Sequence, residues 1–308
     1  MMDNQSQHAV EYQPGTVAGD YDLFLILEQA LADLVGRLGF AEEGVGEDEA
    51  GLAQMWRSKR PLYAHLRQTA EQFWVAQQQG QTVGFARSIL RDGVRELTEL
   101  FVRPGTQSGG LGRGLMERAF PQDGARNRFI IATSDFRAQA LYLKAGVFPR
   151  FPIYFFERAP EQVPFETDLQ MVPLRADAET VAMLGEIDRE VIGFRRDVDH
   201  QWFLANRRGF LYVRNGRPAG YGYVAENSGP FALLEASDFP AVLAHAESTA
   251  QAAGHTQFGV EVPMVNETAV TYLLARHYKM DVFMAMFMSE RPLGNFDRYL
   301  VTSPPFFV

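Results

Sequence analysis

Hydrophobic positions recur along this chain with two different periods, and they predict an ordered series of helices and strands. A first strand is expected over residues 8–13, followed by a helix over residues 20–39. One side of that helix carries an apolar stripe at helical spacing, made of Leu23, Ile26, Leu27, Ala30, Leu31, Leu34 and Leu38. A second helix of similar character is expected over residues 49–69, and Pro61 is expected to kink or split it.

Short apolar or alternating runs, separated by turn residues, predict strands in the next part of the chain. They cover residues 73–76, 82–90, 96–103, 128–133 and 151–156. The three strands up to residue 103 are expected to form an antiparallel meander. A helix is expected from Phe136 to Ala145, because Ser134 or Asp135 can cap its start and Gly146 can end it.

The stretch over residues 96–120 runs from a predicted strand through a glycine-dense loop into a predicted helix. The loop leaves the backbone bare where a ligand could approach, at Gly109, Gly110, Gly112 and Gly114. The amides that start the following helix have no intrahelical acceptor, and they lie at the positive end of the helix dipole. The stretch therefore predicts a cradle for a diphosphate.

Two well-known phosphate-binding loops fit this stretch poorly. No Gly-Lys-Ser/Thr follows, as a P-loop requires, and Leu115 stands where a dinucleotide fingerprint has its third glycine. The alternative to a diphosphate cradle is a glycine-rich surface turn.

The second half of the chain repeats the plan of the first. Residues 216–223 match residues 80–87, and residues 258–262 followed by 266–269 match residues 129–133 followed by 135–138. Self-similarity at domain length indicates a tandem of like domains. A chain of 308 residues is also long enough for two domains of about 150 residues each.

The two halves differ where chemistry would lie. The counterpart of the glycine loop, residues 229–240, lacks the run of glycines and places Pro240 near the helix start. Leu273 takes the place of Tyr142, and His277 takes the place of a glycine. We therefore do not expect the second half to hold a diphosphate in the same way.

Composition narrows the classes of function. The chain has no cysteine, which excludes disulfides, thiolate nucleophiles and cysteine-ligated zinc, and its six histidines show no metal-ligand spacing, so no metal is expected. A formal net charge of -9 argues against nucleic-acid binding and favours a cationic substrate such as an amine. Because no long apolar run or signal-peptide segment occurs, we expect a cytoplasmic protein without a membrane span.

One basic cluster departs from the acidic balance. It is interpreted as the solvated face of a helix and its exit loop rather than as a ligand site. Its members are Arg195, Arg196, Arg207, Arg208, Arg214 and Arg217.

The spacing Gln107-x-x-Gly110-x-Gly112, directly after a strand ending Leu-Phe-Val-x-Pro, resembles the acetyl-CoA loop of the GNAT superfamily of N-acyltransferases. The resemblance implies an α/β (α+β) fold of two tandem GNAT-like domains, each a mixed, largely antiparallel central sheet flanked by helices. A catalytic, acetyl-CoA-binding domain would span residues 1–157 and a linker residues 158–169. A degenerate GNAT-like domain would span residues 170–308, where softer motifs resemble the acetyltransferase-like domain found behind a standard GNAT domain in some bacterial proteins.

The resemblance also implies the residues that would hold CoA. In this family the strand before the loop splays from its neighbour and pairs through its backbone with the pantetheine arm, which implies Phe101, Val102 and Arg103. The loop and helix start would take the pyrophosphate, which implies Gln107, Gly109, Gly110, Leu111, Gly112, Arg113 and Gly114.

The run from Ala138 to Gly146 resembles the family's Ala-x-x-Leu-Tyr-x-x-x-Gly segment, in which the tyrosine hydroxyl often reaches the CoA sulfur. Tyr142 is accordingly the candidate general acid for transfer from a thioester to an amine. Its alternative role is packing.

The general base is less narrowly defined by the sequence. Glu96 stands where some family members place a base, while Glu99 lies three residues on and should project to the opposite face of the strand. Either residue could instead be a solvated strand carboxylate. A water chain, or the C-terminal carboxylate at Val308, is a further alternative, as is a C-terminal tail packed on the second domain.

The resemblance implies transfer of an acetyl group from acetyl-CoA to a primary amine of a small molecule or peptide. In this fold, helices over residues 20–69, with Trp56, Tyr63 and His65, would line the acceptor side. A CoA-binding sensor or scaffold without turnover is the alternative function. We expect the second domain to serve the first, either by covering its acceptor cleft or by forming a homodimer.

Overall fold

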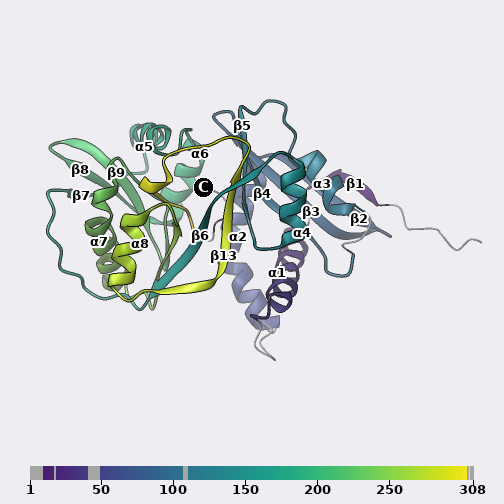
Figure 1. The fold of residues 1–308 in the computed structure, drawn as a ribbon, viewed down its shortest axis with the longest axis horizontal. Coiled ribbons are helices and arrows are strands. Elements are labelled where there is room, and N and C mark those ends of the chain that lie inside the picture. Colours follow the sequence, from purple (N-terminus) through teal and green to yellow (C-terminus); the bar gives the residue numbers. More distant parts are fainter. Residues whose placement is uncertain (1–9, 17–18, 41–48, 107–109, 304, 306–308) are drawn as a thin grey trace, which may run out of the picture. The chain divides into compact units, whose positions relative to one another are not determined.

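The structure is a computed structural model that describes residues 10–16, 19–40, 49–106, 110–303 and 305. The chain divides into two compact units, which are described separately below (Figure 1). Unit 1 comprises Met1–Leu90 and Arg95–Arg126, and unit 2 comprises Arg91–Val94 and Asn127–Val308.

Unit 1 contains a sheet with strand order β1-β2-β3-β4 and three helices. The elements are β1 (Glu11–Pro14), α1 (Asp20–Arg37), α2 (Glu49–Thr69), β2 (Ala70–Gln78), β3 (Gln81–Arg91), β4 (Val94–Val102) and α3 (Leu111–Ala119). The predicted series of elements is confirmed, and α2 runs unbroken through Pro61 instead of splitting there. The predicted apolar stripe of α1 is buried in part, but Leu38 caps the helix end and is 37% exposed.

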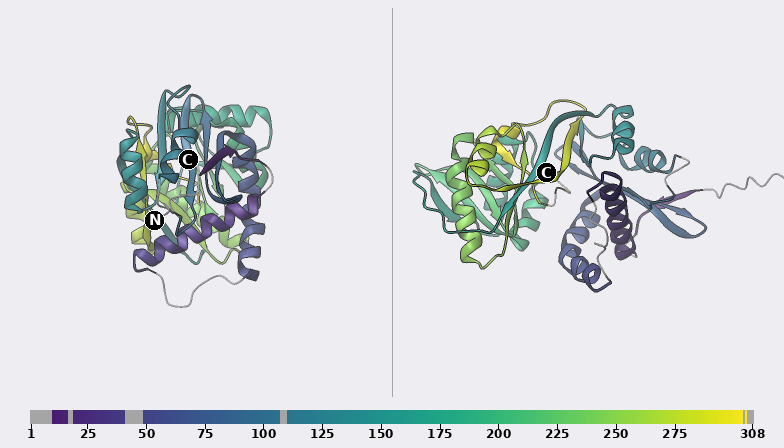
Figure 2. Two further views of the ribbon diagram at one scale, coloured as in Figure 1. Left: turned by 90° about the vertical axis from the view of Figure 1, so that its right-hand side faces the viewer. Right: turned by 60° about the horizontal axis from the view of Figure 1, so that its bottom comes forward.

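The two faces of this sheet are covered by different helices (Figures 1 and 2). Leu23 and Ile26 of α1 pack with Val75 and Phe85 on one face. The neighbouring Gly84 lies against α3 on the other face, where a side chain would meet the side chains of α3. Strand alternation therefore separates an α1 face from an α3 face.

Unit 2 contains two sheets, and residues 170–300 follow the same order of elements as the first half of the chain. Its first elements are β5 (Asn127–Ala132), α4 (Phe136–Lys144) and β6 (Phe148–Arg158). The repeat then runs through β7 (Gln170–Pro173), α5 (Ala178–Val191), α6 (Asp197–Asn206), β8 (Arg208–Arg214), β9 (Arg217–Val224), β10 (Asn227–Ser228), β11 (Phe231–Leu233), η1 (Ala236–Asp238), α7 (Phe239–Ala252), β12 (Phe258–Pro263), α8 (Glu267–Ala275), β13 (Lys279–Ser289), η2 (Phe296–Arg298) and β14 (Tyr299–Leu300).

The sheets of unit 2 have the orders β5-β13-β6-β12-β10 and β14-β11-β9-β8-β7. The described pairings are antiparallel, except that β10 pairs with β12 in parallel. Helices α5 and α6 pack together, as do α7 and α8. The predicted fold class, a mixed and largely antiparallel sheet flanked by helices, is confirmed.

Strand β13 belongs to the second repeat in sequence order, but it pairs with two strands that precede that repeat. It lies between β5 and β6, with Met288 opposite Ile130 and Phe287 opposite Phe151. On its other side β6 pairs with β12 of the second repeat. The predicted strand over residues 151–156 is therefore part of a strand, β6, that has a neighbouring strand on each side.

The predicted linker over residues 158–169 has no helix or strand after β6 ends at Arg158. Its backbone is nevertheless held to α7, since the Val163 amide donates to the Ser248 hydroxyl at 2.9 Å and Val163 is buried. Leu169 at its end is buried as well. The segment is thus a packed connection, while the proposed domain limits on either side of it stay a prediction.

Candidate functional site

The end of β4 leads into the predicted CoA loop through a short turn in unit 1. The Arg103 amide donates to the Val83 carbonyl at 2.8 Å, which continues the pairing of β4 with β3 by one residue. The Thr106 hydroxyl then donates to the Arg103 carbonyl at 2.7 Å, and Gly105 has a φ of 83°, which an L side chain rarely adopts. Gln107 and Gly109 lie outside the described residues.

The start of α3 has the features of an anion site. Gly110 precedes the helix with a φ of 82° and provides no side-chain cap. The first turn of α3 contains no acidic residue. The first intrahelical bond runs from the Gly114 amide to the Gly110 carbonyl at 2.9 Å. The amides of Leu111, Gly112 and Arg113 therefore have no acceptor within the helix, and they lie at its positive end. Such a helix start can bind a phosphate oxygen.

The glycines of this region serve different purposes. A Cβ on Gly114 would lie 2.2 Å from the Tyr12 hydroxyl oxygen of β1, so the absence of a side chain there permits packing inside unit 1. The same Tyr12 hydroxyl donates to the Leu111 carbonyl at 3.4 Å, and the Arg118 guanidinium lies 4.1 Å from the Tyr12 ring centre. Gly114 was predicted as part of the CoA cradle, and the structure accounts for it through Tyr12.

The residues at the end of β4 are tightly packed against the neighbouring strand. Phe101 packs on Phe85 with ring centres 5.9 Å apart, and a Cβ on Gly84 would lie 2.9 Å from the Phe101 carbonyl oxygen. Phe101 and Val102 are both partly buried. Close backbone approach at Gly84 keeps β3, β4 and α3 together next to the predicted loop.

The two carboxylates of β4 are both removed from solvent. Glu99 is 2% exposed and its carboxylate accepts from the Arg87 guanidinium at 2.9 Å, while Glu96 is 3% exposed. Burial raises the pKa of Glu99, and Arg87 opposes that rise. The alternative of a solvated strand carboxylate is therefore wrong for both residues. Alternation along β4 places Glu96 on the face opposite Glu99.

Tyr142 lies on α4, in unit 2, and is 6% exposed. Burial raises the pKa of its hydroxyl, and the nearby negative charge of Asp135 raises it further. The hydroxyl is consequently protonated at neutral pH, the state that a proton donor needs. Asp135 also caps α4, since its carboxylate accepts from the Arg137 amide at 2.9 Å, which confirms one of the two predicted caps. The α3 start belongs to unit 1 and Tyr142 to unit 2.

The second repeat has different chemistry at the place that corresponds to the α3 start. Strand β11 leads through η1 directly into α7, and Pro240 lies in the first turn of that helix. The Asp238 carboxylate lies at the helix start and accepts from the Arg214 guanidinium at 2.8 Å. A helix start that already has a carboxylate and a proline offers little to a phosphate. His277, which takes the place of Gly146, adopts a left-handed φ as Gly146 does.

The structure contains a buried polar network in unit 2 that the sequence did not reveal. Asp188 accepts from the Arg196 Nε at 2.8 Å and lies 2.8 Å from His200 Nε2. The other His200 nitrogen lies 3.0 Å from the Tyr223 hydroxyl, and the Tyr221 hydroxyl donates to Asp188. All five side chains are at most 1% exposed. The sequence signal that could have indicated this network is Asp188, a carboxylate among the apolar positions of the helix over residues 178–191.

This network corrects the interpretation of the basic cluster as a solvated face. Arg196 is fully buried beside Asp188, and burial lowers the pKa of Arg207 to about 10. Arg207 donates to the Ser303 carbonyl at 2.7 Å and so ties down the last described residues. Arg195 and Arg214 are only partly buried and form ion pairs. Arg195, Arg196 and Arg214 are paired with acids, whereas Arg208 and Arg217 are exposed, as the interpretation of a solvated face expects.

Other predicted features can be placed only in part. Among the described residues no cluster of three potential ligands for a metal ion occurs, and no described helix is long and apolar enough to cross a membrane. Of the predicted acceptor-side residues, Tyr63 is fully buried and His65 is 7% exposed, and Trp56 packs on Tyr63 with ring centres 5.5 Å apart. The C-terminal carboxylate at Val308 lies outside the described residues.

Residues 69–146, which include β4, the loop and α3, match the family model of the acetyltransferase (GNAT) domain. This segment of the chain is similar to a GNAT domain. No curated protein matches the sequence at a significant level. The matched segment ends at Gly146, so the family model covers Tyr142 as well as the helix start.

Solved structures extend the GNAT likeness over nearly the whole chain. A protein from Pyrococcus horikoshii, provisionally titled an acetyltransferase, is 16% identical with a TM-score of 0.68, covering 97% of this chain and 96% of that one. A tandem GNAT protein from the clavulanic acid biosynthesis pathway is 14% identical with a TM-score of 0.54, covering 92% and 99%. A GCN5-related glucosamine N-acetyltransferase region of a fungal multi-domain GH3 β-N-acetylglucosaminidase is 14% identical with a TM-score of 0.64. It covers 94% of this chain and 39% of that protein. At these identities the likeness shows the fold, and a tandem arrangement agrees with it.

Proposed function

We propose that this protein is an N-acetyltransferase that moves an acetyl group from acetyl-CoA to a primary amine of a small molecule or peptide. The observation that carries the proposal is the start of α3, where three backbone amides lack intrahelical acceptors. This helix start follows β4 and the loop that resembles the acetyl-CoA loop of GNAT proteins. The GNAT domain over residues 69–146 supports acyl transfer in general. That the donor is acetyl-CoA and the acceptor a primary amine is proposed in addition to acyl transfer in general.

The reaction joins the amine nitrogen to the acyl carbon and breaks the bond between that carbon and the CoA sulfur. The amine must lose a proton, and the leaving thiolate must gain one or be stabilised. Tyr142 is the candidate for the second task, because its hydroxyl is protonated at neutral pH and it lies in the segment that resembles the family's Ala-x-x-Leu-Tyr-x-x-x-Gly run. For the first task we assign Glu96, which alternation along β4 places on the face opposite Glu99, or a water next to it.

We propose further that the second repeat does not bind CoA. Asp238 and Pro240 at the start of α7 support this, because a carboxylate repels phosphate and a proline lacks the amide that would donate to it. One CoA per chain is then the expected stoichiometry. The second repeat contributes strand β13, which lies between β5 and β6.

Calorimetry with CoA tests this stoichiometry. We expect one site per chain, and we expect Gly112→Asp to abolish binding, because a carboxylate would then stand beside the free amides of α3. Ser237→Asp, at an exposed position in η1, is the matched control and should leave the titration unchanged. Two equal sites, or equal losses in both variants, would contradict the proposal.

Turnover with a panel of amines tests the activity. The panel should contain polyamines, aminoglycosides, amino-acid amines and an amino sugar, the last because the fungal protein of the same fold is titled a glucosamine N-acetyltransferase region. Transfer to at least one amine, lost in Gly112→Asp, is the expected result. Tight CoA binding without transfer to any amine would instead favour a CoA-binding sensor or scaffold.

A further inference from the structure

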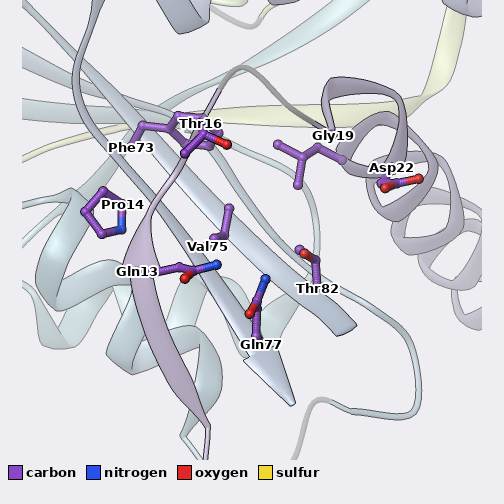
Figure 3. A pocket seen from close by; sticks show the side chains of 10 residues that line it. Gln13, Pro14, Thr16, Gly19, Asp22, Phe73, Val75, Gln77 and Thr82 are labelled. Atoms are coloured by element: carbon purple, nitrogen blue, oxygen red, sulfur yellow. The ribbon is translucent and has the colours of Figure 1, made fainter. Parts of the chain in front are cut away.

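A pocket of about 270 Å³ lies in unit 1, at the edge of its sheet. It is bounded by β1, by Thr16 and Gly19, by the first turn of α1, and by β2 and β3. All of these elements belong to unit 1, so the pocket is defined within one compact body. We call it the Gln13–Gln77 pocket after two of the side chains that line it (Figure 3).

Strand register explains why polar side chains meet in this pocket. Gln13 of β1 is paired with Val75 of β2, and Gln77 lies two residues further along β2 on the same face. Gln77 is paired in turn with Thr82 of β3. Three adjacent strands therefore present Gln13, Gln77 and Thr82 on one side, and Figure 3 shows these three side chains around a common space.

The apolar floor of the pocket is formed by side chains that lie between α1 and the sheet. Val75 is 8% exposed and Leu23 is 4% exposed, and both belong to the apolar cluster between α1 and the sheet. Asp22, in the first turn of α1, is exposed and provides the carboxylate among the lining residues. The pocket thus joins an apolar floor to a polar rim, an arrangement typical of small-molecule sites.

The polar rim is not engaged by the protein itself. The side chains of Gln13, Gln77, Thr82 and Asp22 form no hydrogen bond or ion pair with any other residue in the part of the chain that the structure describes. Two amides and a hydroxyl supply both donors and acceptors, while the carboxylate only accepts. These groups converge on one space and are free to bind a ligand.

The charge of the rim defines the class of ligand. Among the residues that the structure describes, no lysine, arginine or histidine lines the pocket, so an anion would find no cationic partner among them. The Asp22 carboxylate favours an ammonium group, and the amides and hydroxyl favour alcohol or amide groups on the same molecule. The apolar floor favours a carbon ring or chain between them.

We propose that the Gln13–Gln77 pocket binds a hydroxylated organic amine, such as an amino sugar, and holds the polar body of the acyl acceptor. The acceptor role rests on the proposed acetyltransferase activity, whereas the binding itself does not. An amine paired with Asp22 is protonated and cannot attack the thioester, so a reacting amine is a second one or one released from the carboxylate.

The test compares three probes that share a six-membered ring, on the full chain without acetyl-CoA. Glucosamine has the amine and the hydroxyls, glucose lacks the amine, and cyclohexylamine lacks the hydroxyls. Calorimetry or NMR titration should show that glucosamine binds at least about tenfold more tightly than either, since each lost contact removes a hydrogen bond or a charge pair. Equal affinities for the three probes would overturn the proposal.

Paired variants locate the binding. Gln77→Leu should weaken glucosamine binding about tenfold. Gln78→Leu is the matched control, because Gln78 is the next residue of β2, projects to the other face and does not line the pocket. Asp22→Asn should reduce the affinity for glucosamine to that for glucose. Equal effects of the two glutamine variants, or no effect of either, would overturn the assignment to this pocket.

Transfer assays separate this inference from the proposed function. If glucosamine binds, Gln77→Leu weakens it, and no amine is acetylated, the pocket stands as a binding site and the acetyltransferase proposal falls. If glucosamine is acetylated with a KM that Gln77→Leu does not change, acetyl transfer stands and the role of the pocket is refuted. If Gln77→Leu raises the KM for glucosamine and leaves kcat unchanged, the result supports both the pocket as the acceptor site and the acetyltransferase activity.

Discussion

Phe287→Ala tests whether β13 is an integral strand of unit 2 in the way the structure shows. Phe287 is 0% exposed and packs on three aromatic rings. Its ring centre lies 4.8 Å from that of Phe151 on β6, 5.3 Å from that of Phe129 on β5, and 4.6 Å from that of Phe296 on η2. The substitution would leave a cavity where β5, β6 and β13 meet.

The expected loss follows from this packing. Truncating a fully buried phenylalanine costs about 3–5 kcal/mol, and the value should lie at the upper end because three ring contacts disappear together. A domain of ordinary stability has only about 5–15 kcal/mol in total. We therefore expect the unfolding transition that reports unit 2 to fall by roughly 10 °C or more.

Urea and thermal unfolding measure this loss, followed by circular dichroism and calorimetry. Phe148→Ala is the matched control, because Phe148 lies on the neighbouring β6 but is 51% exposed, so its loss should cost clearly less. If the two variants lose the same stability, Phe287 is not at the centre of this aromatic cluster. The placement of β13 between β5 and β6 would then be refuted.

Three further predictions concern the site, the strand pairing and a buried acid. Tyr142→Phe should lower turnover about 10²-fold and leave CoA affinity within a few-fold; unchanged turnover would return this residue to a packing role. Ile130→Cys combined with Met288→Cys should form a disulfide under oxidising conditions, because the two residues are paired across β5 and β13 and the natural chain has no cysteine to interfere; a persistent free-thiol signal would contradict the pairing. Burial raises the pKa of Glu261 to about 8, so the folded state holds a proton that the unfolded state has released, and stability should fall as the pH rises from about 4 to 8. Glu261→Gln should flatten that fall in urea titrations across this range, and an unchanged slope would show that the carboxyl is already ionised.

Local features of the sequence indicated the likeness to GNAT proteins. The glycine-dense segment after a strand and before a helix identified the start of α3, because a bare helix start is a property of a few consecutive residues. The cap of α4 by Asp135 and the end of that helix near Gly146 followed from the same kind of local rule. The repeat of elements in the second half was likewise visible, since each element has its own short pattern.

Partners distant in the sequence could not be inferred in this way. The arginine cluster was interpreted as solvated, yet Arg196 is buried because Asp188 and Tyr221 reach it from other elements. The contact of Tyr12 of β1 with Gly114 was likewise not visible in the sequence, and the role of Gly114 in CoA binding stays a prediction. The composition of a segment carries no information about which remote side chain folding will bring next to it.

Strand order was also decided only by the tertiary structure. The sequence predicts the strand over residues 151–156, which is β6, but its pattern is equally compatible with an edge position or a central one. The position of β13 between β5 and β6 depends on long-range pairing, such as Met288 with Ile130, and on the stacking of Phe287 with Phe129. The Gln13–Gln77 pocket has the same origin. Its side chains come from three strands and a helix whose mutual register is established only when the sheet forms, so the sequence determined the residues and the fold alone brought them together.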